Sequence, residues 1–400
     1  MDADLSHRER RLIADARAFA RDAVAPHAAV WERERRMPVE TLRAAARLGL
    51  CGMMVGHEHG GSGIRFSAVM GVFEELATAC MAFAFSLEVQ NNLARSIAGH
   101  GTAAQIGRHL PALLSGETIG AFLLTEPGAG SDASAIATTA LRDGGGWVID
   151  GEKAWVTNAA GAGLLCVFAQ TDAAAGWRGI AAFLVEADNP GALRGAPYEM
   201  MGGHATGTGG FSFSGCRVAD DAVLLGPSAA FKEAMRGIDI ARVGVGALCC
   251  GMLRDGLDRA LEYAMQRRAF GQATIEFQGL QWMLADVATD LEAARLLTLT
   301  AARAIDDARS DNAQSDNARS DNSGTVAAAH AKKFATRAAL KGLADCMQVM
   351  GAAGYKADQP LGRHLACAKM AHYLDGTTEI QNLVIARDLM RRGDGSGDRS

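Results

Sequence analysis

The 400-residue chain has no apolar run long enough to cross a membrane, which needs roughly 18 consecutive apolar residues. Its longest apolar stretch, Val243 to Leu253, is rich in glycine and cysteine. Residues 1–19 are charged, and they lack the basic segment, apolar segment and small-residue cleavage site of a secretory leader. We therefore expect a cytoplasmic protein without a transmembrane helix.

Motifs that bind metals or form disulfides are also missing. The chain has no CxxC pair, no HExxH and no Cys/His cluster at metal-ligand spacing. Its eight cysteines, which fall in mostly apolar sequence, are Cys51, Cys80, Cys166, Cys216, Cys249, Cys250, Cys346 and Cys367. A chain of this size does not need disulfides for stability, so we expect reduced core cysteines and no metal site.

The charge of the chain is small and mixed in sign, with a formal net charge of −5. The sequence has no basic stripe that could bind a phosphate backbone and no basic amphipathic segment that could bind an anionic lipid surface. We therefore expect neither nucleic acid nor a membrane as a partner.

Three regions differ in the spacing of their apolar residues, and the length of the chain allows two or three domains. Residues 1–119 have helical spacing, residues 120–226 contain short strand-like segments between Gly, Asp, Asn and Pro clusters, and residues 227–392 return to long helical segments. The predicted strands are Trp147 to Ile149, Leu164 to Phe168, Ile180 to Val185 and Gly210 to Phe213. The predicted helices of the last region are Phe231 to Gln266, Ile275 to Asp306, Val326 to Val349, Pro360 to Tyr373 and Thr378 to Arg391.

This order predicts an α+β fold: an N-terminal helical domain, a mainly antiparallel, barrel-like β domain and a C-terminal helical bundle. It argues against alternating βαβ units.

A five-residue repeat, ARSDN, AQSDN, ARSDN, occupies residues 308–322. We interpret 308–323 as a flexible solvent loop, with a docking or metal-binding loop as the alternative. Residues 393–400 are expected to be a disordered tail.

Three strings carry candidate ligand contacts. Ala121 to Ala140 places a Thr-Glu-Pro turn and small residues after an apolar strand, where backbone N–H groups can approach a planar or anionic ligand. Gly151 to Asn158 sets an aromatic side chain beside a hydroxyl, which suits a flat heteroaromatic cofactor. Arg267 to Gln272 ends a long helix with cations. For each string alone, ordinary packing or a helix terminus is the favoured interpretation.

A fourth string, QVMGAAGYKADQPLGRHLACAKMAHYLDGTTEIQNLVIAR, runs from Gln348 to Arg387. Together and in this order, the four strings resemble the acyl-CoA dehydrogenase family, and the resemblance extends from about Arg10 to Met390. It implies FAD as cofactor, a C-terminal four-helix bundle, an acyl-CoA substrate and an electron-transfer flavoprotein as acceptor. Because the family builds its cofactor site from two chains, it also implies a homo-oligomer, namely a tetramer.

The resemblance also implies roles for individual residues. Those implied at the flavin of the same subunit are Phe122, Leu124, Thr125, Ser131, Trp155 and Thr157. Those implied at the flavin of a neighbouring subunit are Arg267, Phe270, Gln278, Gln348 and Gly351, and those at its phosphate and ribityl region are Thr377 and Glu379. The substrate contacts that it implies are Ser131, Asp239, Arg242 and Gly376.

Asp375 stands in the string LDGTT, where the family usually has glutamate, and is the implied catalytic base. A thioester carbonyl acidifies the adjacent α C–H, so a carboxylate can remove that proton while the β hydride passes to flavin N5. Burial should raise the pKa of such a carboxylate toward neutrality. Some family members carry the base on the long central helix, but the matching residue here is Ala241.

Several residues depart from the family pattern and keep alternatives open. Aspartate is one methylene shorter than glutamate, so a substrate held differently, an acyl group on a carrier protein, or a weakly active acyl-thioester-binding homologue are alternatives. A flavin oxidase, either nitroalkane-oxidase-like or an acyl-CoA oxidase, is another, although Asn382 stands where nitroalkane oxidase has arginine. We also expect His204 and the pair Ala366–Cys367 to alter the substrate end. Glu88 is interpreted as a surface residue, with the pocket floor as the alternative.

Overall fold

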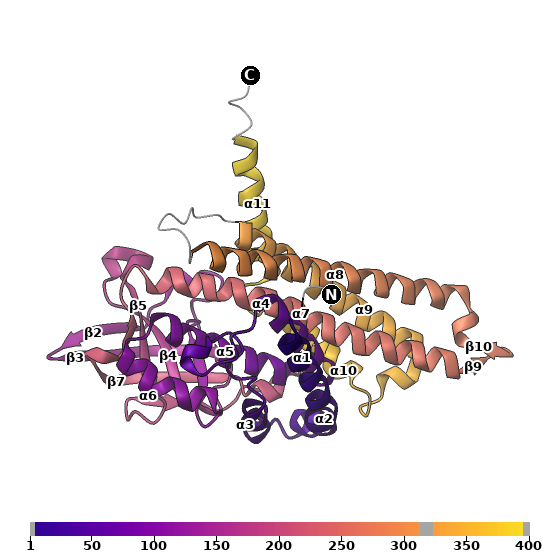
Figure 1. Cartoon of the computed structure of the whole chain (residues 1–400), viewed down its shortest axis with the longest axis horizontal. Coiled ribbons are helices and arrows are strands. Elements are labelled where there is room, and N and C mark those ends of the chain that lie inside the picture. The colour runs from indigo at the N-terminus through magenta and orange to yellow at the C-terminus, as the bar shows by residue number, and fades with distance from the viewer. Residues whose placement is uncertain (1–4, 313–322, 395–400) are drawn as a thin grey trace.

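Helical regions flank a β-sheet in the computed structural model, which describes residues 5–312 and 323–394 (Figure 1). The N-terminal helices are α1 (His7–Phe19), α2 (Ala25–Arg33), α3 (Val39–Arg47), α4 (Phe66–Ala79), α5 (Met81–His100) and α6 (Ala103–Leu114), with a π-helical turn (Ala20–Val24) between α1 and α2. The C-terminal helices are α7 (Ala230–Gln266), α8 (Gln278–Asn312), α9 (Ser323–Met350), α10 (Leu361–Ala371) and α11 (Thr378–Asp394). The predicted order of helices, strands and helices is confirmed.

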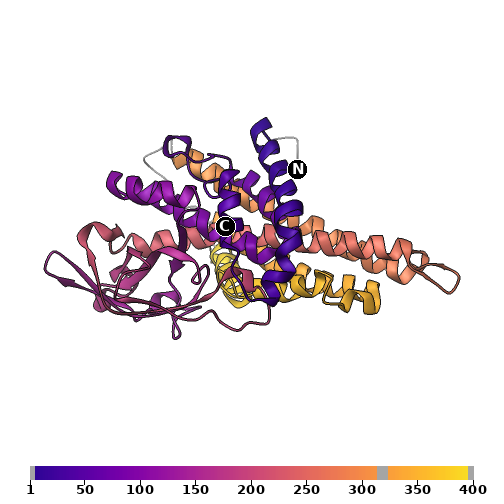
Figure 2. The same ribbon diagram turned by 90° about the horizontal axis from the view of Figure 1, so that it is seen from below.

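The middle region forms one eight-stranded sheet at one end of the molecule (Figure 2). Its strands are β1 (Ile119–Leu123), β2 (Thr139–Asp143), β3 (Gly146–Val156), β4 (Ala162–Gln170), β5 (Ile180–Glu186), β6 (Ala192–Arg194), β7 (Gly209–Ala219) and β8 (Val223–Leu225). The order is β6-β7-β3-β2-β4-β5-β8, and β1 pairs with β4. All ladders are antiparallel except β1 with β4 and a single pair between β2 and β4. The sheet is therefore mainly antiparallel, as predicted.

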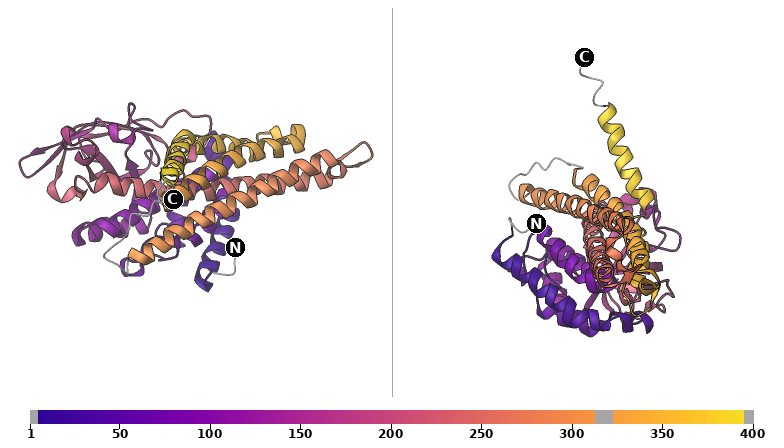
Figure 3. Two further views of the ribbon diagram at one scale, coloured as in Figure 1. Left: turned by 90° about the horizontal axis from the view of Figure 1, so that it is seen from above. Right: turned by 90° about the vertical axis from the view of Figure 1, so that its right-hand side faces the viewer.

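The long helices α7, α8 and α9 pack against one another, and α4 and α5 pack on α7 (Figure 3). A short hairpin, β9 (Arg268–Ala269) with β10 (Gln272–Ala273), joins α7 to α8 at the end of the molecule opposite the sheet (Figure 1). Helix α11 packs on α9 at its start and then projects away from the bundle (Figure 3). Helix α8 continues through the first repeat unit to Asn312, and residues 313–322 and 395–400 lie outside the described residues.

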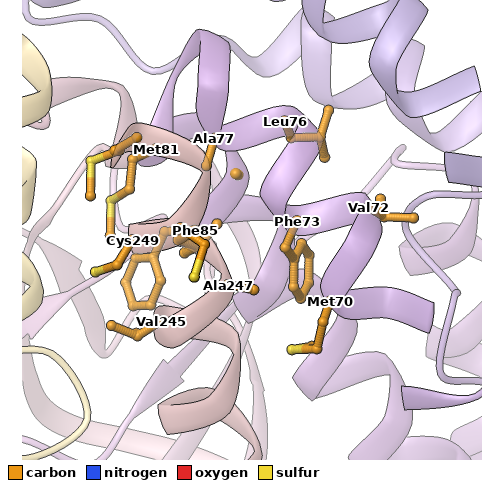
Figure 4. Close-up of a cluster of buried hydrophobic side chains, with 14 of the residues drawn as sticks. Met70, Val72, Phe73, Leu76, Ala77, Met81, Phe85, Val245, Ala247 and Cys249 are labelled. Carbon is orange, nitrogen blue, oxygen red and sulfur yellow. The ribbon is translucent and has the colours of Figure 1, made fainter. Parts of the chain in front are cut away.

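A hydrophobic core forms where α4, α5 and α7 meet (Figure 4). Phe73, Phe85 and Val245 come from these three helices and are nearly or completely buried. Burying a side chain of this size stabilises a fold by about 1.5–3 kcal/mol, so this junction fixes the relative positions of the three helices. All eight cysteines are free, and all are buried except Cys80, which is partly buried, as the sequence predicts.

Two features are absent from residues 5–312 and 323–394. No helix there is long and apolar enough to cross a membrane. No group of His, Cys, Asp and Glu side chains there could hold a metal ion.

Gly251 tests the close packing of α7 on α4. A Cβ added at Gly251 would lie 2.3 Å from the Glu74 carbonyl oxygen and 2.8 Å from Ala77 Cβ. Because backbone cannot yield cheaply, Gly251→Ala should lower the free energy of unfolding by about 1–3 kcal/mol. Gly107 lies in the exposed middle of α6 with nothing near its added Cβ. Gly107→Ala should therefore raise the free energy of unfolding by up to about 1 kcal/mol. Denaturant titration of both variants measures these changes. If both substitutions changed the free energy of unfolding in the same direction, the packing argument would be contradicted.

Candidate active site

The turn between α10 and α11 carries Asp375 in an uncommon backbone conformation. Asp375 has φ 51° and Gly376 has φ 93°. Non-glycine residues rarely adopt positive φ, and they persist there only when their surroundings fix them. The position of the Asp375 carboxylate is therefore set by the contacts of this turn.

Asp375 lines a cavity between the sheet and helices α5 and α7. The cavity has an empty volume of about 640 Å³ with its open mouth included. Most of its wall is apolar, contributed by residues of α5, α7, β1, β4, β5 and β8, and it includes Ala241. Its polar lining residues are Asn92, Arg95, Ser96, Glu233 and Asp375. The cavity can thus hold a largely apolar group against a carboxylate.

Asp375 and Glu233 are the two carboxylates that line this cavity, and their environments differ. Asp375 Oδ2 is buried and has no hydrogen-bond partner among the described residues. Burial raises the pKa of Asp375 to about 6, against the opposing positive charges of Lys332 and Arg242. A hydrogen bond with His100, together with the charge of Arg236, lowers the pKa of Glu233. Asp375 therefore has the proton affinity and the free oxygen that a general base needs near neutral pH.

Two cations hold the main chain of the Asp375 turn. Arg242 of α7 donates from Nε to the Asp375 carbonyl oxygen at 3.0 Å, and Lys332 of α9 donates from Nζ to the Gly376 carbonyl oxygen. Arg242 Nη1 also pairs with Asp239 Oδ1 at 2.8 Å, and Thr325 donates to the other Asp239 oxygen at 2.6 Å. Asp239 and Arg242 thus support the turn, and their direct contact with CoA stays a prediction.

The surface interpretation of Glu88 is wrong. Glu88 is 1 % exposed on α5, and neither carboxylate oxygen has a hydrogen-bond partner among the described residues. A Cβ added at Gly244 would lie 1.9 Å from Glu88 Oε1, so the carboxyl group occupies the space that this glycine leaves on α7. Burial raises the pKa of Glu88 well above its usual value, and the charge of Asp375 adds to the rise. Burial therefore favours the protonated form of Glu88.

The loop after β1 and the end of β3 lie side by side and carry several predicted flavin contacts. We call the surface that they form the ledge. The Ala154 N–H donates to the Thr125 carbonyl oxygen at 2.9 Å, which places Trp155 next to this loop. Trp155 has φ 57° and is 62 % exposed, whereas Leu124 and Thr157 are buried. The indole, which makes an edge contact with Tyr198, still presents exposed apolar surface, and such a surface fits a planar ligand such as an isoalloxazine ring. Phe122 lies in the wall of the cavity, and Ser131 is exposed.

A buried ion pair supports this ledge, and the sequence did not reveal it. Lys153 is fully buried, and its Nζ lies 2.7 Å from Glu126 Oε1. Glu126 also accepts hydrogen bonds from the N–H groups of Ala137 and Thr138 at 2.6 and 3.0 Å. The pair therefore ties the loop of residues 125–132 to β3, because the ammonium and the carboxylate would each be costly to bury alone.

Other predicted flavin contacts are not brought to this cavity within one chain. Arg267, Phe270 and Gln278 are exposed at or beside the β9–β10 hairpin, far from the sheet (Figure 1). Gln348 and Gly351 are exposed at the end of α9. This placement suits residues that contact a neighbouring subunit, and their contact with its flavin stays a prediction. Thr377 and Glu379 directly follow the Asp375 turn, at the start of α11.

The remaining sequence departures lie together, away from the cavity wall. His204 Nδ1 lies 2.8 Å from Glu32 Oε1 of α2. A Cβ added at Gly203 would lie 3.7 Å from Cys367 Sγ, and one at Gly202 would lie 2.7 Å from Ala366 Cβ. His204, Ala366 and Cys367 therefore belong to the packing of α2 and α10 on the loop before β7. None of the three lines the cavity, so the expectation that they alter the substrate end receives no support from their positions.

Family models match nearly the whole chain. They describe the acyl-CoA dehydrogenase N-terminal domain at residues 6–117, the middle domain at 121–216 and the C-terminal domain at 231–390. The mitochondrial short-chain specific acyl-CoA dehydrogenase of Bos taurus is 37% identical over 376 residues, which cover 94% of this chain and 88% of the relative. The acryloyl-CoA reductase (NADH) of Anaerotignum propionicum is 35% identical over 98% of this chain and 97% of its own.

Solved structures give the same result. The butyryl-CoA dehydrogenase of Megasphaera elsdenii has a TM-score of 0.90 at 31% identity, covering 98% of this chain and all of its own. A chain in a structure of the electron transferring flavoprotein of Acidaminococcus fermentans has a TM-score of 0.91 at 33% identity, with the same coverage. The exposed Trp155 ledge fits FAD, the cofactor of this family. The chain is an FAD-dependent oxidoreductase that belongs to the acyl-CoA dehydrogenase family.

Proposed function

We propose that this protein oxidises the Cα–Cβ bond of an acyl-CoA thioester, with Asp375 as the base that removes the α proton. The observation that carries the proposal is the Asp375 carboxylate at the cavity wall, with one free oxygen and a pKa raised to about 6 by burial. Ala241 offers no carboxylate from the central helix, and the pKa of Glu233 is lowered instead. Glu88 is buried and does not line the cavity, and burial favours its protonated form.

The reaction would divide one bond oxidation into two transfers. The α C–H bond breaks toward Asp375 Oδ2, which gains the proton, and the electron pair left behind forms the Cα–Cβ double bond. The β carbon loses a hydride, so the substrate gives up two electrons in total. FAD, when bound, supplies the acceptor for that hydride. With the substrate bound, the apolar wall of the cavity would exclude water from the base and hold the reacting atoms in place.

The predicted flavin contacts belong to this proposal. Leu124, Thr125, Trp155 and Thr157 would hold the flavin ring on the ledge. Arg267, Phe270, Gln278, Gln348 and Gly351 would reach the flavin of a neighbouring subunit, which is why we propose a tetramer. We also propose transfer of the electrons to an electron-transfer flavoprotein, supported by the similarity to a chain in a structure of such a system. A cytoplasmic location stays a prediction.

Asp375→Asn separates the proposed base from the other roles of the turn. The variant should bind FAD and acyl-CoA but reduce its flavin at least 100-fold more slowly, measured anaerobically by the loss of flavin absorbance on rapid mixing with a panel of acyl-CoA thioesters. The folded pKa of Asp375, about 6, lies above the ordinary 3.8, so ionisation costs stability as pH rises between these values. At pH 8 the variant should therefore be more stable by about 2 kcal/mol, allowing for the open mouth of the cavity.

Asp358→Asn, on an exposed loop, is the matched control and should change neither quantity. Full flavin reduction in Asp375→Asn would refute the base. If no acyl-CoA bleaches the flavin of the wild type, the dehydrogenase proposal fails. Rapid oxygen consumption by the reduced wild-type enzyme would instead identify an oxidase.

The pH dependence of flavin reduction provides a separate prediction. Because Asp375 must be ionised to accept a proton, the rate should rise about tenfold per pH unit below about 6 and level off above it. Single-turnover rates between pH 5 and 8 measure this limb. A rate that stays constant from pH 5 to 7 would contradict the assignment of Asp375.

Lys153→Met tests the buried pair under the flavin ledge. Removing the ammonium leaves the Glu126 carboxylate buried with only backbone donors, so the variant should lose about 3 kcal/mol of unfolding free energy and bind FAD at least tenfold more weakly. The double variant Glu126→Gln/Lys153→Met should recover part of both losses. Lys356→Met, at an exposed lysine, is the control. Unchanged FAD affinity in Lys153→Met would show that the pair does not support the flavin site.

A further inference from the structure

Lys332 differs from Arg242 in how its charge is balanced. The Arg242 guanidinium pairs with the carboxylate of Asp239, which Thr325 also contacts. Lys332 is 1 % exposed, and its hydrogen-bond acceptor is the neutral carbonyl oxygen of Gly376. Among the side chains that the structure describes, no carboxylate oxygen lies within 4.0 Å of the Lys332 Nζ atom. A buried ammonium without an adjacent anion is costly, so the charge needs compensation from further away.

The ionised carboxylate of Asp375 is the foremost source of that compensation. Asp375 is the first of the charges that favour the protonated form of Lys332, and Lys332 is in turn the first of the charges that favour the ionised form of Asp375. Burial lowers the pKa of Lys332 to about 8. Between about pH 6 and 8, therefore, the lysine is charged while the aspartate is ionised.

We propose that Lys332 is a positioning residue for Asp375: its ammonium holds the Gly376 carbonyl and supplies the positive charge against which Asp375 ionises. Lys332 acts through its hydrogen bond to the main chain and through the electrostatic effect of its ammonium charge on Asp375. This inference rests on the proposed function, in which Asp375 is the base.

The other charged groups around the turn do not replace Lys332. From α7, Arg242 also favours ionisation of Asp375, but its guanidinium is already paired with the Asp239 carboxylate. From α5, Glu88 is held toward its protonated form because burial raises its pKa. Burial lowers the pKa of His372, which favours its neutral form, and Glu379 of α11 is exposed to solvent. Lys332 is thus the cation near Asp375 whose charge no neighbouring carboxylate neutralises.

Lys332→Met removes the charge and the donor while keeping a side chain of similar length. In the FAD-loaded enzyme, with an acyl-CoA that reduces the wild type, the acid limb of flavin reduction should move to higher pH by about one unit, because losing a cation raises the pKa of Asp375. The rate at pH 7 should fall by about tenfold or more. Lys332→Arg keeps the charge and should keep the acid limb near pH 6. Lys333→Met, one residue further along α9 and partly exposed, should leave the profile unchanged.

An acid limb in Lys332→Met that coincides with that of the wild type would overturn the inference while leaving the base assignment intact. A second readout needs no activity and so survives failure of the proposed function. At pH 8, Asp375→Asn should raise the unfolding midpoint more in the Lys332→Met background than in the wild type, because the buried anion has lost its cation. Equal shifts in the two backgrounds would also overturn it. If Lys332→Met does not fold, Lys332→Arg decides, since a shifted acid limb there contradicts the role of the charge.

Discussion

A carboxylate base in an apolar cavity must satisfy two opposing demands: it needs a high affinity for a proton, and it must still be able to ionise. Burial gives Asp375 the proton affinity of a base, but the same burial disfavours the ionised form that accepts a proton. The pKa of about 6 is the net result of burial on one side and the charges of Lys332 and Arg242 on the other. Because these cations come from α9 and α7, the packing of the two helices sets the chemistry of the turn.

The backbone of this turn offers a physical reason for aspartate in place of glutamate. Asp375 adopts φ 51°, a region in which aspartate and asparagine are several-fold enriched among non-glycine residues. Arg242 and Lys332 hold consecutive carbonyls, so the turn is fixed in this conformation at both peptide units. The shorter side chain then has to be matched by a substrate that approaches the turn closely. The cavity also contains Asn92, Arg95 and Ser96, so its wall is not purely apolar.

Much of the fold could be predicted from the sequence because it depends on local spacing. Helical periodicity located α7 to α11 to within a few residues at most boundaries, and turn residues located β3, β4, β5 and β7. The proposal of Asp375 as the base rests on a family resemblance, since nothing in the local string LDGTT predicts that its Oδ2 atom is buried. Glu88 was misassigned because one charged residue in an apolar helix carries no information about the glycine that faces it, here Gly244.

Lys332 and Lys153 were not predicted, for a related reason. Lys332 interrupts the buried alanine stripe of α9, between Ala328 and Ala335, and this interruption was the available sign that its side chain points inward. Its partner, the Gly376 carbonyl, lies 44 residues further along the chain. The pair Lys153 and Glu126 likewise depends on strand register, which periodicity does not specify.

The most direct test of the account follows the α proton itself. An acyl-CoA analogue with sulfur in place of the β carbon cannot give up a hydride but keeps an acidic α C–H. Incubated with the FAD-loaded enzyme in D2O, it should exchange its α hydrogen for deuterium with the wild type, as measured by mass spectrometry, and should not exchange with Asp375→Asn. Equal deuterium incorporation by the two proteins would contradict the claim that Asp375 is the base.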